Sequence, residues 1–514
     1  MADPFTLSVI QAGLENAAEE MFAVLRKTAM SPIIYEVLDV GTGVTDAAGR
    51  LVSSGAGIPT FVGVLDKAVQ ALVARFGETL REGDVFVTND PNFGGVTHLN
   101  DVVIAKPVFF DGACVAWTAS IAHWGDIGGK VPGSMATDVT EIFAEGLRLP
   151  AVRLFDAGEP IRAVFDIIAA NSRLPDFVHG DLWAQIAAGN SAEAQILALF
   201  RKFGAETVAR AIEDGFETGR ARALAGLAAL PAGRYEIEEE QDDGALWRAA
   251  ITISDARFTV DLTGNPAERA APYNTSRDGA VISAQMIFKA LCDPDVFANA
   301  GSFAPLEVIT EAGTIFHAGP TAPQGYYFET RIRLVDLLWQ CMAQALPGRL
   351  PVGSFSSIFG TVIAGVHPDT GRRYTLVEPQ MGGWGATADR DGMDAMFSTN
   401  HGDTFTCPVE ICETRYGLDV VHKALAERPE LDVRHRGGRG VSVLYRTRGP
   451  ATLSVGYTRG VVPVWSAGAA PKGGTNVMRV LRRSGDTETH RFVSGLRLAP
   501  GDQVLIETAH GGNW

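Results

Sequence analysis

Helix-like and strand-like stretches follow one another in blocks along this sequence, and their order limits the fold more than any other feature. Apolar residues at helical spacing predict a long amphipathic helix over residues 5–29. Helical patterns return over about 192–230, and strand-like alternation dominates after about residue 440. A doubly wound sheet needs a steady alternation of strand and helix. The blocks therefore favour an α+β fold, with mixed layers, a long N-terminal helix and a β-rich C-terminal part.

The length of 514 residues is enough for more than one domain. We divide the chain into a 1–230 region, a mixed α/β region over 231–440 and a β-rich region over 441–514. No internal repeat or low-complexity linker marks these borders, so they rest on the change of pattern alone.

Composition and missing motifs exclude several functions. The formal net charge of −16 argues against a surface for nucleic acid or an anionic membrane, which would need a basic stripe. The five cysteines are scattered without a CxxC pair, which argues against a disulfide framework and a cysteine-based zinc site. The start lacks the pattern of a secretory signal, and no apolar run approaches the roughly 20 residues of a membrane span, so we expect a cytoplasmic protein. No nucleotide-binding loop occurs, which predicts that ATP is not bound by this chain itself.

Two strand-like runs, VVIAKPVFF and ACVAWTASIAHW, surround Asp111-Gly112, which is a strong signal for a two-residue type I′ turn. If Phe110 pairs with Ala113, His123 lies opposite Asn100, and His98 is its diagonal neighbour on the same face. Diagonal neighbours lie roughly 7–8 Å apart at Cα, within reach of two imidazoles that share one ion. Asp101 would point to the other face, unless the pairing ends there.

Two histidines and one carboxylate suit a divalent metal, with positions left for water or substrate. The same set describes the facial triad of non-haem iron. In the alternative interpretation, His98 caps a glycine-rich turn and His123 is an ordinary buried histidine. Gly-Gly pairs at 94–95 and 128–129 flank the hairpin, as expected where backbone approaches a ligand closely.

The sequence resembles the hydantoinase B/oxoprolinase family, which includes the B-type subunits of ATP-dependent N-methylhydantoinases and caprolactamases. The C-terminal half of 5-oxoprolinases and subunits of acetone and acetophenone carboxylases are related. The matching stretches span nearly the whole chain in family order: NDPNFGGVTHLND, AHWGDIGGKVPGSM, EIFAEGLRLPAVRL, DPDVFANAGSFAPLEVI, MGGWGATADRDGMDA and CPVEICETRYGLDV.

The resemblance implies that His98, Asp101 and His123 bind a catalytic divalent metal, zinc or manganese, and that Asp39 completes the site. It also implies an A-type ATPase partner, which binds ATP and phosphorylates the substrate carbonyl oxygen, in a hetero-oligomer such as A2B2. The B-type chain would then use the metal to open an activated cyclic amide or imide. The alternative is carboxylation of a ketone. A non-catalytic scaffold is a third possibility, which the retention of all three presumed ligands argues against.

Five further residues have either a role in the reaction or a purely structural role. Asp126, three residues after His123, would orient a ligand histidine or move a proton, or would simply form a turn before Ile-Gly-Gly. Glu145 and Arg148 would hold substrate or take part in a structural ion pair. Cys407 and Cys412 are expected to be buried structural thiols.

Overall fold

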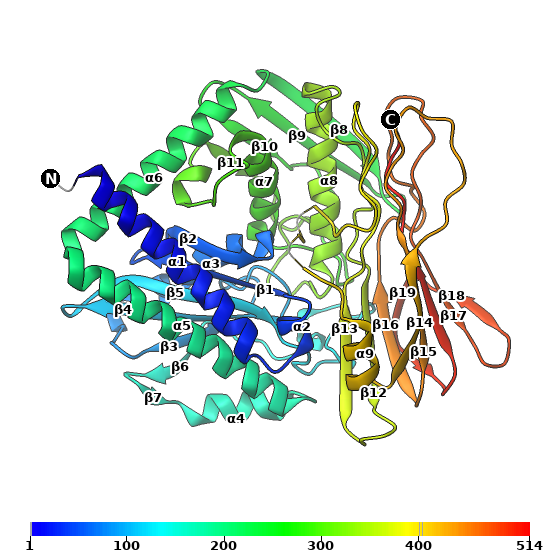
Figure 1. Cartoon of the computed structure of the whole chain (residues 1–514), viewed down its shortest axis with the longest axis horizontal. Helices are drawn as coiled ribbons and strands as arrows, with labels where there is room; N and C mark the ends of the chain where they lie inside the picture. The colour runs from blue at the N-terminus through cyan, green and yellow to red at the C-terminus, as the bar shows by residue number, and fades with distance from the viewer. Residues whose placement is uncertain (1–2, 400, 403) are drawn as a thin grey trace.

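The computed structural model describes residues 3–399, 401, 402 and 404–514, and it shows an α+β fold, as predicted. Figure 1 shows helices and a first sheet in the N-terminal part, further helices and a second sheet in the middle, and strands toward the C-terminus. The long N-terminal helix is α1 (Pro4–Thr28), and the described residues after 441 form strands and loops without a helix. The expected β-rich C-terminal part is thereby confirmed.

The N-terminal sheet has seven antiparallel strands, in the order β2-β1-β5-β4-β3-β6-β7. Its two central strands are the long hairpin that the sequence predicts. The strand bounds are β1 (Val40–Asp46), β2 (Leu51–Gly57), β3 (Val85–Thr88), β4 (Asp101–Phe110), β5 (Ala113–His123), β6 (Val152–Asp156) and β7 (Glu159–Pro160).

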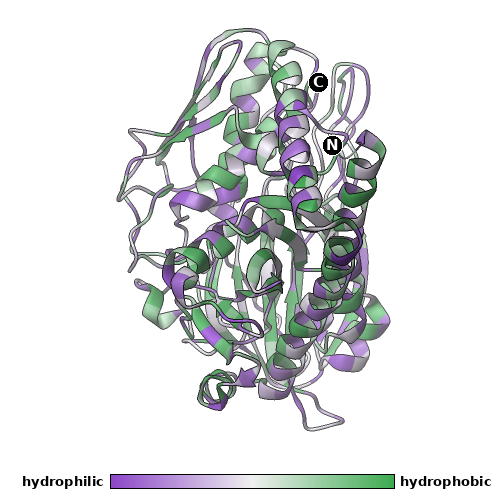
Figure 2. Ribbon diagram, turned by 90° about the vertical axis from the view of Figure 1, so that its left-hand side faces the viewer, coloured by the Kyte–Doolittle hydropathy of each residue, from purple (hydrophilic) through white to green (hydrophobic). Residues whose placement is uncertain are grey.

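Helices cover both faces of this sheet. On one face α1 and α5 pack together against β1, β4 and β5, and α3 packs on the other face. Gly41 of β1 is needed there, because a Cβ at this position would lie 2.8 Å from Phe61 Cβ of α3. The hydropathy colours in Figure 2 show apolar and polar residues on different sides of the helices. Their bounds are α2 (Pro32–Tyr35), α3 (Pro59–Phe76), α4 (Arg162–Asn171), α5 (Pro175–Phe203) and α6 (Ala205–Ala228), with short 3₁₀ turns at Gly77–Thr79 and Ile142–Ala144.

The predicted register of the hairpin is wrong by one residue. Asp111 and Gly112 both have positive φ, as a type I′ turn requires, and Phe110 pairs with Ala113. The register then shifts between Val108 and Phe109, because a bulge adds one residue to β5. His123 therefore lies opposite Asp101 and not Asn100, and Asp101 shares its face rather than pointing away.

The middle of the chain forms a four-stranded sheet, β11-β10-β9-β8, against which α7 and α8 pack. Its strands are β8 (Gly233–Glu240), β9 (Leu246–Ile253), β10 (Phe258–Asp261) and β11 (Leu306–Ile309). The helices are α7 (Arg277–Cys292) and α8 (Tyr327–Ala345), and a 3₁₀ turn covers Ala300–Phe303. α8 is buried along most of its length, which places it between the N-terminal and C-terminal parts (Figure 1).

Two further sheets complete the fold, one with the order β13-β12-β16-β19 and one with the order β14-β15-β20-β17-β18. Strands β12 and β13 thus join β16 and β19 across residue 440, and the three-region division of the chain stays a prediction. The elements are β12 (Gly360–Val366), β13 (Arg373–Glu378), α9 (Val409–Arg415), β14 (Leu418–Leu425), β15 (Val441–Thr447), β16 (Ala451–Gly456), β17 (Val477–Leu481), β18 (Thr487–Thr489), β19 (Phe492–Leu498) and β20 (Gln503–Glu507).

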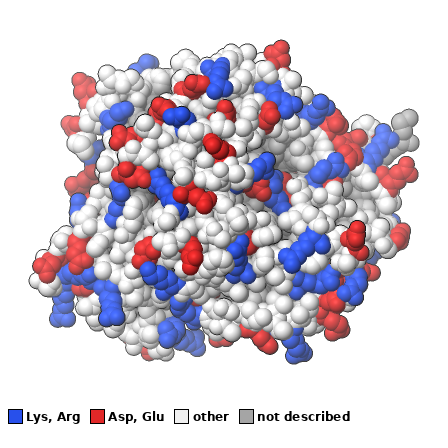
Figure 3. All heavy atoms as spheres, turned by 180° about the vertical axis from the view of Figure 1, so that it is seen from behind, with Lys and Arg blue, Asp and Glu red and all other residues white. Residues whose placement is uncertain are grey.

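The surface mixes both signs of charge. On the face shown in Figure 3, acidic and basic side chains lie interspersed rather than in a stripe of one sign. Within the part of the chain that the structure describes, no helix combines the length and apolar character needed to cross a membrane.

Candidate metal centre

His98, Asp101 and His123 meet at one cavity. One ligand atom from each of the three side chains lies within 4.8 Å of the other two, and all three residues are buried. The cavity lies where the N-terminal sheet, α8 and the β12–β13 sheet meet. Its lining consists of Asp39, Ile58, Phe61, His98, Asp101, His123, Met135, Tyr327, Phe328, Arg331, Ile358, Gly360, Val377, Glu378, Pro379 and His401.

The hairpin positions two of the three side chains. Asp101 is the first residue of β4 and His123 is the last residue of β5, so the bulge that corrects the register brings them directly opposite each other. His98 comes from the turn before β4, where Gly95 lies so close to Asn89 that a Cβ would be 2.3 Å from its carbonyl carbon. This close contact folds the turn tightly beside the strand ends, and the approach of the glycine pair to a ligand stays a prediction.

The neighbours of His98 and Asp101 fix their orientation. His98 Nδ1 lies 2.9 Å from the Gly325 carbonyl oxygen, and its Nε2 lies 3.1 Å from Asp101 Oδ1. The Tyr327 hydroxyl donates a hydrogen bond to Asp101 Oδ2 at 3.2 Å. A histidine whose Nδ1–H is held by a carbonyl presents Nε2 as the free ligand atom, which is the usual arrangement at protein metal sites.

Burial and neighbouring charges shift the pKa values of these groups in different directions. Burial lowers the pKa of His123 to about 4, with a further contribution from His98. Burial also opposes the charged form of His98, but the adjacent Asp101 outweighs it and the pKa of His98 is raised. At neutral pH His123 is therefore a neutral imidazole, which is the form that binds a metal.

Asp39 lies at the same cavity, just before β1. Its backbone carbonyl accepts a hydrogen bond from His123 N at 3.1 Å, which ties it to the end of β5. Burial and the nearby Asp101 carboxylate raise the pKa of Asp39 well above its ordinary value. Asp39 is not one of the three residues whose ligand atoms cluster within 4.8 Å, so its role as a fourth ligand stays a prediction.

The donor set fits a divalent ion. In the described part of the chain, Asp39 Oδ1 and His123 Nδ1 are buried without a hydrogen-bond partner, and Asp101 Oδ1 contacts only His98 Nε2, at 3.1 Å. Buried polar atoms in this state cost free energy, because they lose their bonds to water and gain none in exchange. Imidazole nitrogens and carboxylate oxygens at this separation would recover that cost by binding one zinc or manganese ion.

Arg331 of α8 and His401 are among the cavity residues that were not predicted from the sequence. His401 Nε2 has no hydrogen-bond partner among the described residues, and burial, followed by the Arg331 charge, lowers the pKa of His401 to about 3. Arg331 is 1% exposed, and its Nη1 donates to Thr60 Oγ1. The signal for Arg331 was a run of charged residues within an otherwise apolar helical pattern, ETRIRLVDLLWQ.

Asp126 does not line the cavity. Its carboxylate accepts hydrogen bonds from the backbone N–H groups of Gly128, Gly133 and Arg173, and it forms an ion pair with the Arg173 guanidinium at 3.1 Å. These bonds hold the loop that follows β5. The assignment of Asp126 as a proton carrier stays a prediction.

The other weighed residues make structural contacts. Arg148 forms an ion pair with Asp90, and Glu145 instead accepts hydrogen bonds from the backbone of Gln324 and Gly325. Through Gly325, Glu145 therefore supports the carbonyl that holds His98. Cys407 and Cys412 are buried and free, as predicted, and burial raises the pKa of Cys407 to about 12.

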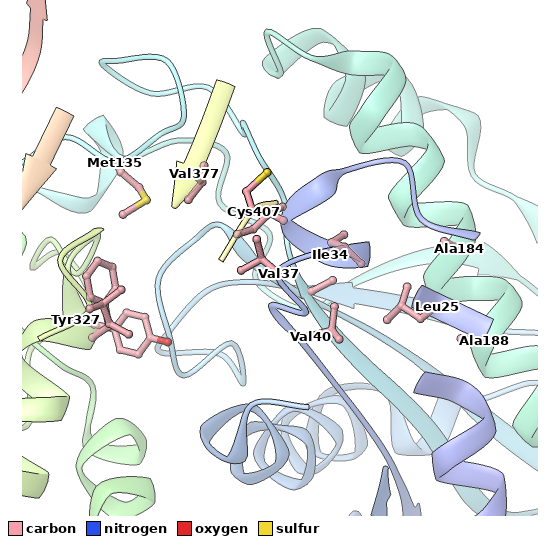
Figure 4. Packing of buried hydrophobic residues seen from close by; sticks show 14 of the residues in the cluster. Leu25, Ile34, Val37, Val40, Met135, Ala184, Ala188, Tyr327, Val377 and Cys407 are labelled. Atoms are coloured by element: carbon pink, nitrogen blue, oxygen red, sulfur yellow. The ribbon is translucent and has the colours of Figure 1, made fainter. Parts of the chain in front are cut away.

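Apolar side chains form much of the remaining wall. Figure 4 shows Met135, Val377 and Tyr327, which come from three separate parts of the chain. Ile58 and Phe61 complete this side, from the segment at the start of α3. Such a wall excludes water and strengthens the electrostatic effect of the few polar groups that face it.

Comparison with known proteins gives matches over nearly the whole chain. The sequence model of hydantoinase B/oxoprolinase matches residues 3–514. The chain is 28% identical to the beta subunit of the caprolactamase of Pseudomonas jessenii, over 100% of this chain and 90% of that protein. It is 29% identical to the B-type subunit of a putative D-/L-hydantoinase of a Pseudomonas species, over 85% of this chain and 77% of the relative.

Solved structures share the fold. The crystal structure of the ATP-dependent caprolactamase from Pseudomonas jessenii superimposes with a TM-score of 0.92 at 25% identity, covering 100% of this chain and 91% of that one. A nucleotide-free acetone carboxylase matches with a TM-score of 0.87 at 17% identity, over 99% of this chain and 76% of that one. The second likeness shows the fold alone.

Proposed function

Because this chain belongs to the hydantoinase B/oxoprolinase family, we propose that it is the B-type subunit of an ATP-dependent hydrolase of cyclic amides. The observation that carries the proposal is the meeting of His98, Asp101 and His123 at one largely apolar cavity. The similarity to a caprolactamase chain and to a putative hydantoinase chain supports the same class of reaction.

His98, Asp101 and His123, with Asp39 beside them, would hold one divalent ion, zinc or manganese. When bound, such an ion polarises a carbonyl or phosphoryl oxygen and lowers the pKa of water, so that attack proceeds near neutral pH. The Gly325 carbonyl holds the orientation of the His98 ring, and the Tyr327 hydroxyl holds the orientation of the Asp101 carboxylate. The apolar wall around Met135 and Phe61 keeps bulk water away from the activated ring.

An unactivated cyclic amide is a poor electrophile, so the reaction needs an activating step. We assign that step to an A-type ATPase partner, which would bind ATP and phosphorylate the carbonyl oxygen of the ring. This chain would then receive the phosphorylated ring and hydrolyse it. Both relatives are named as one subunit of a larger enzyme, which supports a partner, and we propose a hetero-oligomer such as A2B2.

Reconstitution tests the proposal. The chain with its A-type partner should convert caprolactam, hydantoin or 5-oxoproline to a ring-opened acid in step with ATP hydrolysis, and the new oxygen should come from labelled water. His123→Ala should abolish ring opening. Failure to open any of the three rings in the reconstituted pair, with ATP hydrolysis present, would contradict the proposal.

Carboxylation of a ketone is the alternative, and carbon-labelled bicarbonate separates the two reactions. A hydrolase leaves no label in the product, even if bicarbonate stimulates it. Label retained in a new carbon–carbon bond would replace hydrolysis by carboxylation.

A further inference from the structure

Arg331 is a buried cation that has no carboxylate partner among the described residues. It is 1% exposed, and none of the ion pairs in the described part of the chain includes it. Its Nη1 donates to the Thr60 hydroxyl, and its guanidinium carbon lies 5.6 Å from the ring centre of Tyr327. Its Nε has no hydrogen-bond partner within the same part of the chain. Burying a guanidinium with a free N–H donor costs free energy unless an acceptor, such as a bound anion, pairs with it.

The charges around the cavity indicate what is missing. On the proposed function, on which this inference rests, the Asp39 and Asp101 carboxylates balance one divalent ion. Glu378, which also lines the cavity, has its own cation in Lys423 at 3.3 Å. Among the described residues, Arg331 therefore has no carboxylate of its own to balance its positive charge in a site of low dielectric.

We propose that Arg331 binds an oxyanion of the substrate and so selects rings that carry one. The planar guanidinium matches the geometry of a phosphoryl group or a carboxylate better than a lysine would. The anion is either the phosphoryl group that the partner adds to the carbonyl oxygen or a carboxylate on the ring itself. Either anion would enter between Arg331 and the metal ligands, since the arginine and the ligands line the same cavity.

A structural role for Arg331 makes a different prediction. If Arg331 only holds the Asp39 and Asp101 carboxylates in place, its replacement should reduce metal binding. If it binds an anion, metal content should stay the same and anion affinity should fall. Metal content and anion affinity can be measured on the same protein, without any assay of turnover.

Calorimetry on the full chain loaded with zinc tests the inference, with three probes: inorganic phosphate, 5-oxoproline and 2-pyrrolidone, which is the same ring without a carboxylate. If the natural anion is the phosphoryl group, we expect phosphate to bind. If it is a carboxylate on the ring, we expect 5-oxoproline to bind and 2-pyrrolidone not to bind. Arg331→Met and Arg331→Lys should weaken that binding about tenfold or more and leave zinc content unchanged. The lysine variant keeps the charge and serves if the methionine variant does not fold.

Arg333→Lys is the matched control, because Arg333 is an equally buried arginine on α8 that does have carboxylate partners. Its anion affinity should equal that of the unmodified chain. Binding of neither anion, equal affinity in the Arg331 variants, or loss of zinc together with the anion would overturn the inference. Ring opening by the reconstituted pair is a separate measurement, so the proposed function and the role of Arg331 can fail independently.

Discussion

Two polar clusters in the interior each include residues of α8, and they differ in how completely their carboxylate oxygens are hydrogen-bonded. The paired cluster consists of Glu239, Arg333, Asp336 and Arg459. The open cluster consists of Asp39, His98, Asp101, His123 and Arg331. All of these residues are buried except Glu239, which is half-buried, and both clusters contain carboxylates and arginine, so charge alone does not distinguish them.

In the paired cluster all four carboxylate oxygens accept hydrogen bonds. Arg333 and Arg459 both donate to Asp336 Oδ2, at 2.7 and 2.6 Å, and both also contact Glu239. Trp465 donates to the other Asp336 oxygen at 3.0 Å, and Gln340 donates to Glu239 at 3.0 Å. Burial alone would raise the pKa of Glu239, but the two arginines lower it to about 2.

In the open cluster Asp39 Oδ1 and His123 Nδ1 have no hydrogen-bond partner among the described residues, and the pKa of Asp39 is shifted upward. A cluster whose carboxylates are satisfied internally holds secondary structure elements together. A cluster left unsatisfied at a cavity gains stability when a ligand binds to it. The comparison therefore assigns stability to the first cluster and binding to the second.

The largest expected loss of stability comes from a substitution in the paired cluster. Asp336→Ala leaves Arg333 and Arg459 short of a counter-charge in the interior, which should lower the free energy of unfolding by about 3–5 kcal/mol. Denaturant titration measures this, with Asp336→Asn as the control, since it keeps the acceptor oxygen and should lose less. Metal content should not change in either variant. A loss of metal with normal stability would reverse the two assignments.

Glu145 is a third case, a buried carboxylate that only backbone N–H groups satisfy. Burial raises its pKa to about 7, from an ordinary value of 4.5. The folded chain therefore holds this proton more tightly than the unfolded chain, and the stabilisation is complete below about pH 4.5. As the pH rises through 7 the free energy of unfolding should fall by up to about 3 kcal/mol.

Urea titrations at pH 5 and pH 8 measure the fall, and Glu145→Gln should flatten it. An equal pH dependence in the unmodified chain and the glutamine variant would show that backbone hydrogen bonds are enough to keep Glu145 ionised in the interior.

A smaller effect of opposite sign is expected in the open cluster. In the metal-free chain, Asp39→Asn removes a buried charge that repels Asp101, so stability at pH 8 should stay the same or rise by up to about 2 kcal/mol. The affinity for metal should fall in the same variant. Thermal melting with and without zinc measures both. A clear loss of stability in the metal-free variant would mean that Asp39 belongs to the scaffold.

Sequence patterns predicted the helices, strands and turns better than the register in which the strands pair. The α+β class, the long first helix and the Asp111-Gly112 turn follow from local periodicity and turn chemistry, and the structure has all of them. The strand register depended on a bulge in β5, and a bulge in a run of small and apolar residues leaves no local signal. That single extra residue placed Asp101 opposite His123.

The rest of the site depends on contacts between distant segments. His98 and Asp101 are close in sequence, and a shared turn was enough to bring them together. Arg331 reaches them only because α8 packs against the end of the N-terminal sheet, which local patterns do not encode. Asp39 was implied by family resemblance alone, and the structure places it at the cavity, next to the three predicted ligands.

The central claim is that the open cluster binds one divalent ion, and elemental analysis of purified chains tests it most directly. The unmodified chain should carry about one zinc or manganese ion, and His98→Ala and His123→Ala should lose it while remaining folded by circular dichroism. His422→Ala, which changes an exposed histidine on β14, is the control and should keep the ion. Unchanged metal content in both cavity variants, with the fold intact, would contradict the account.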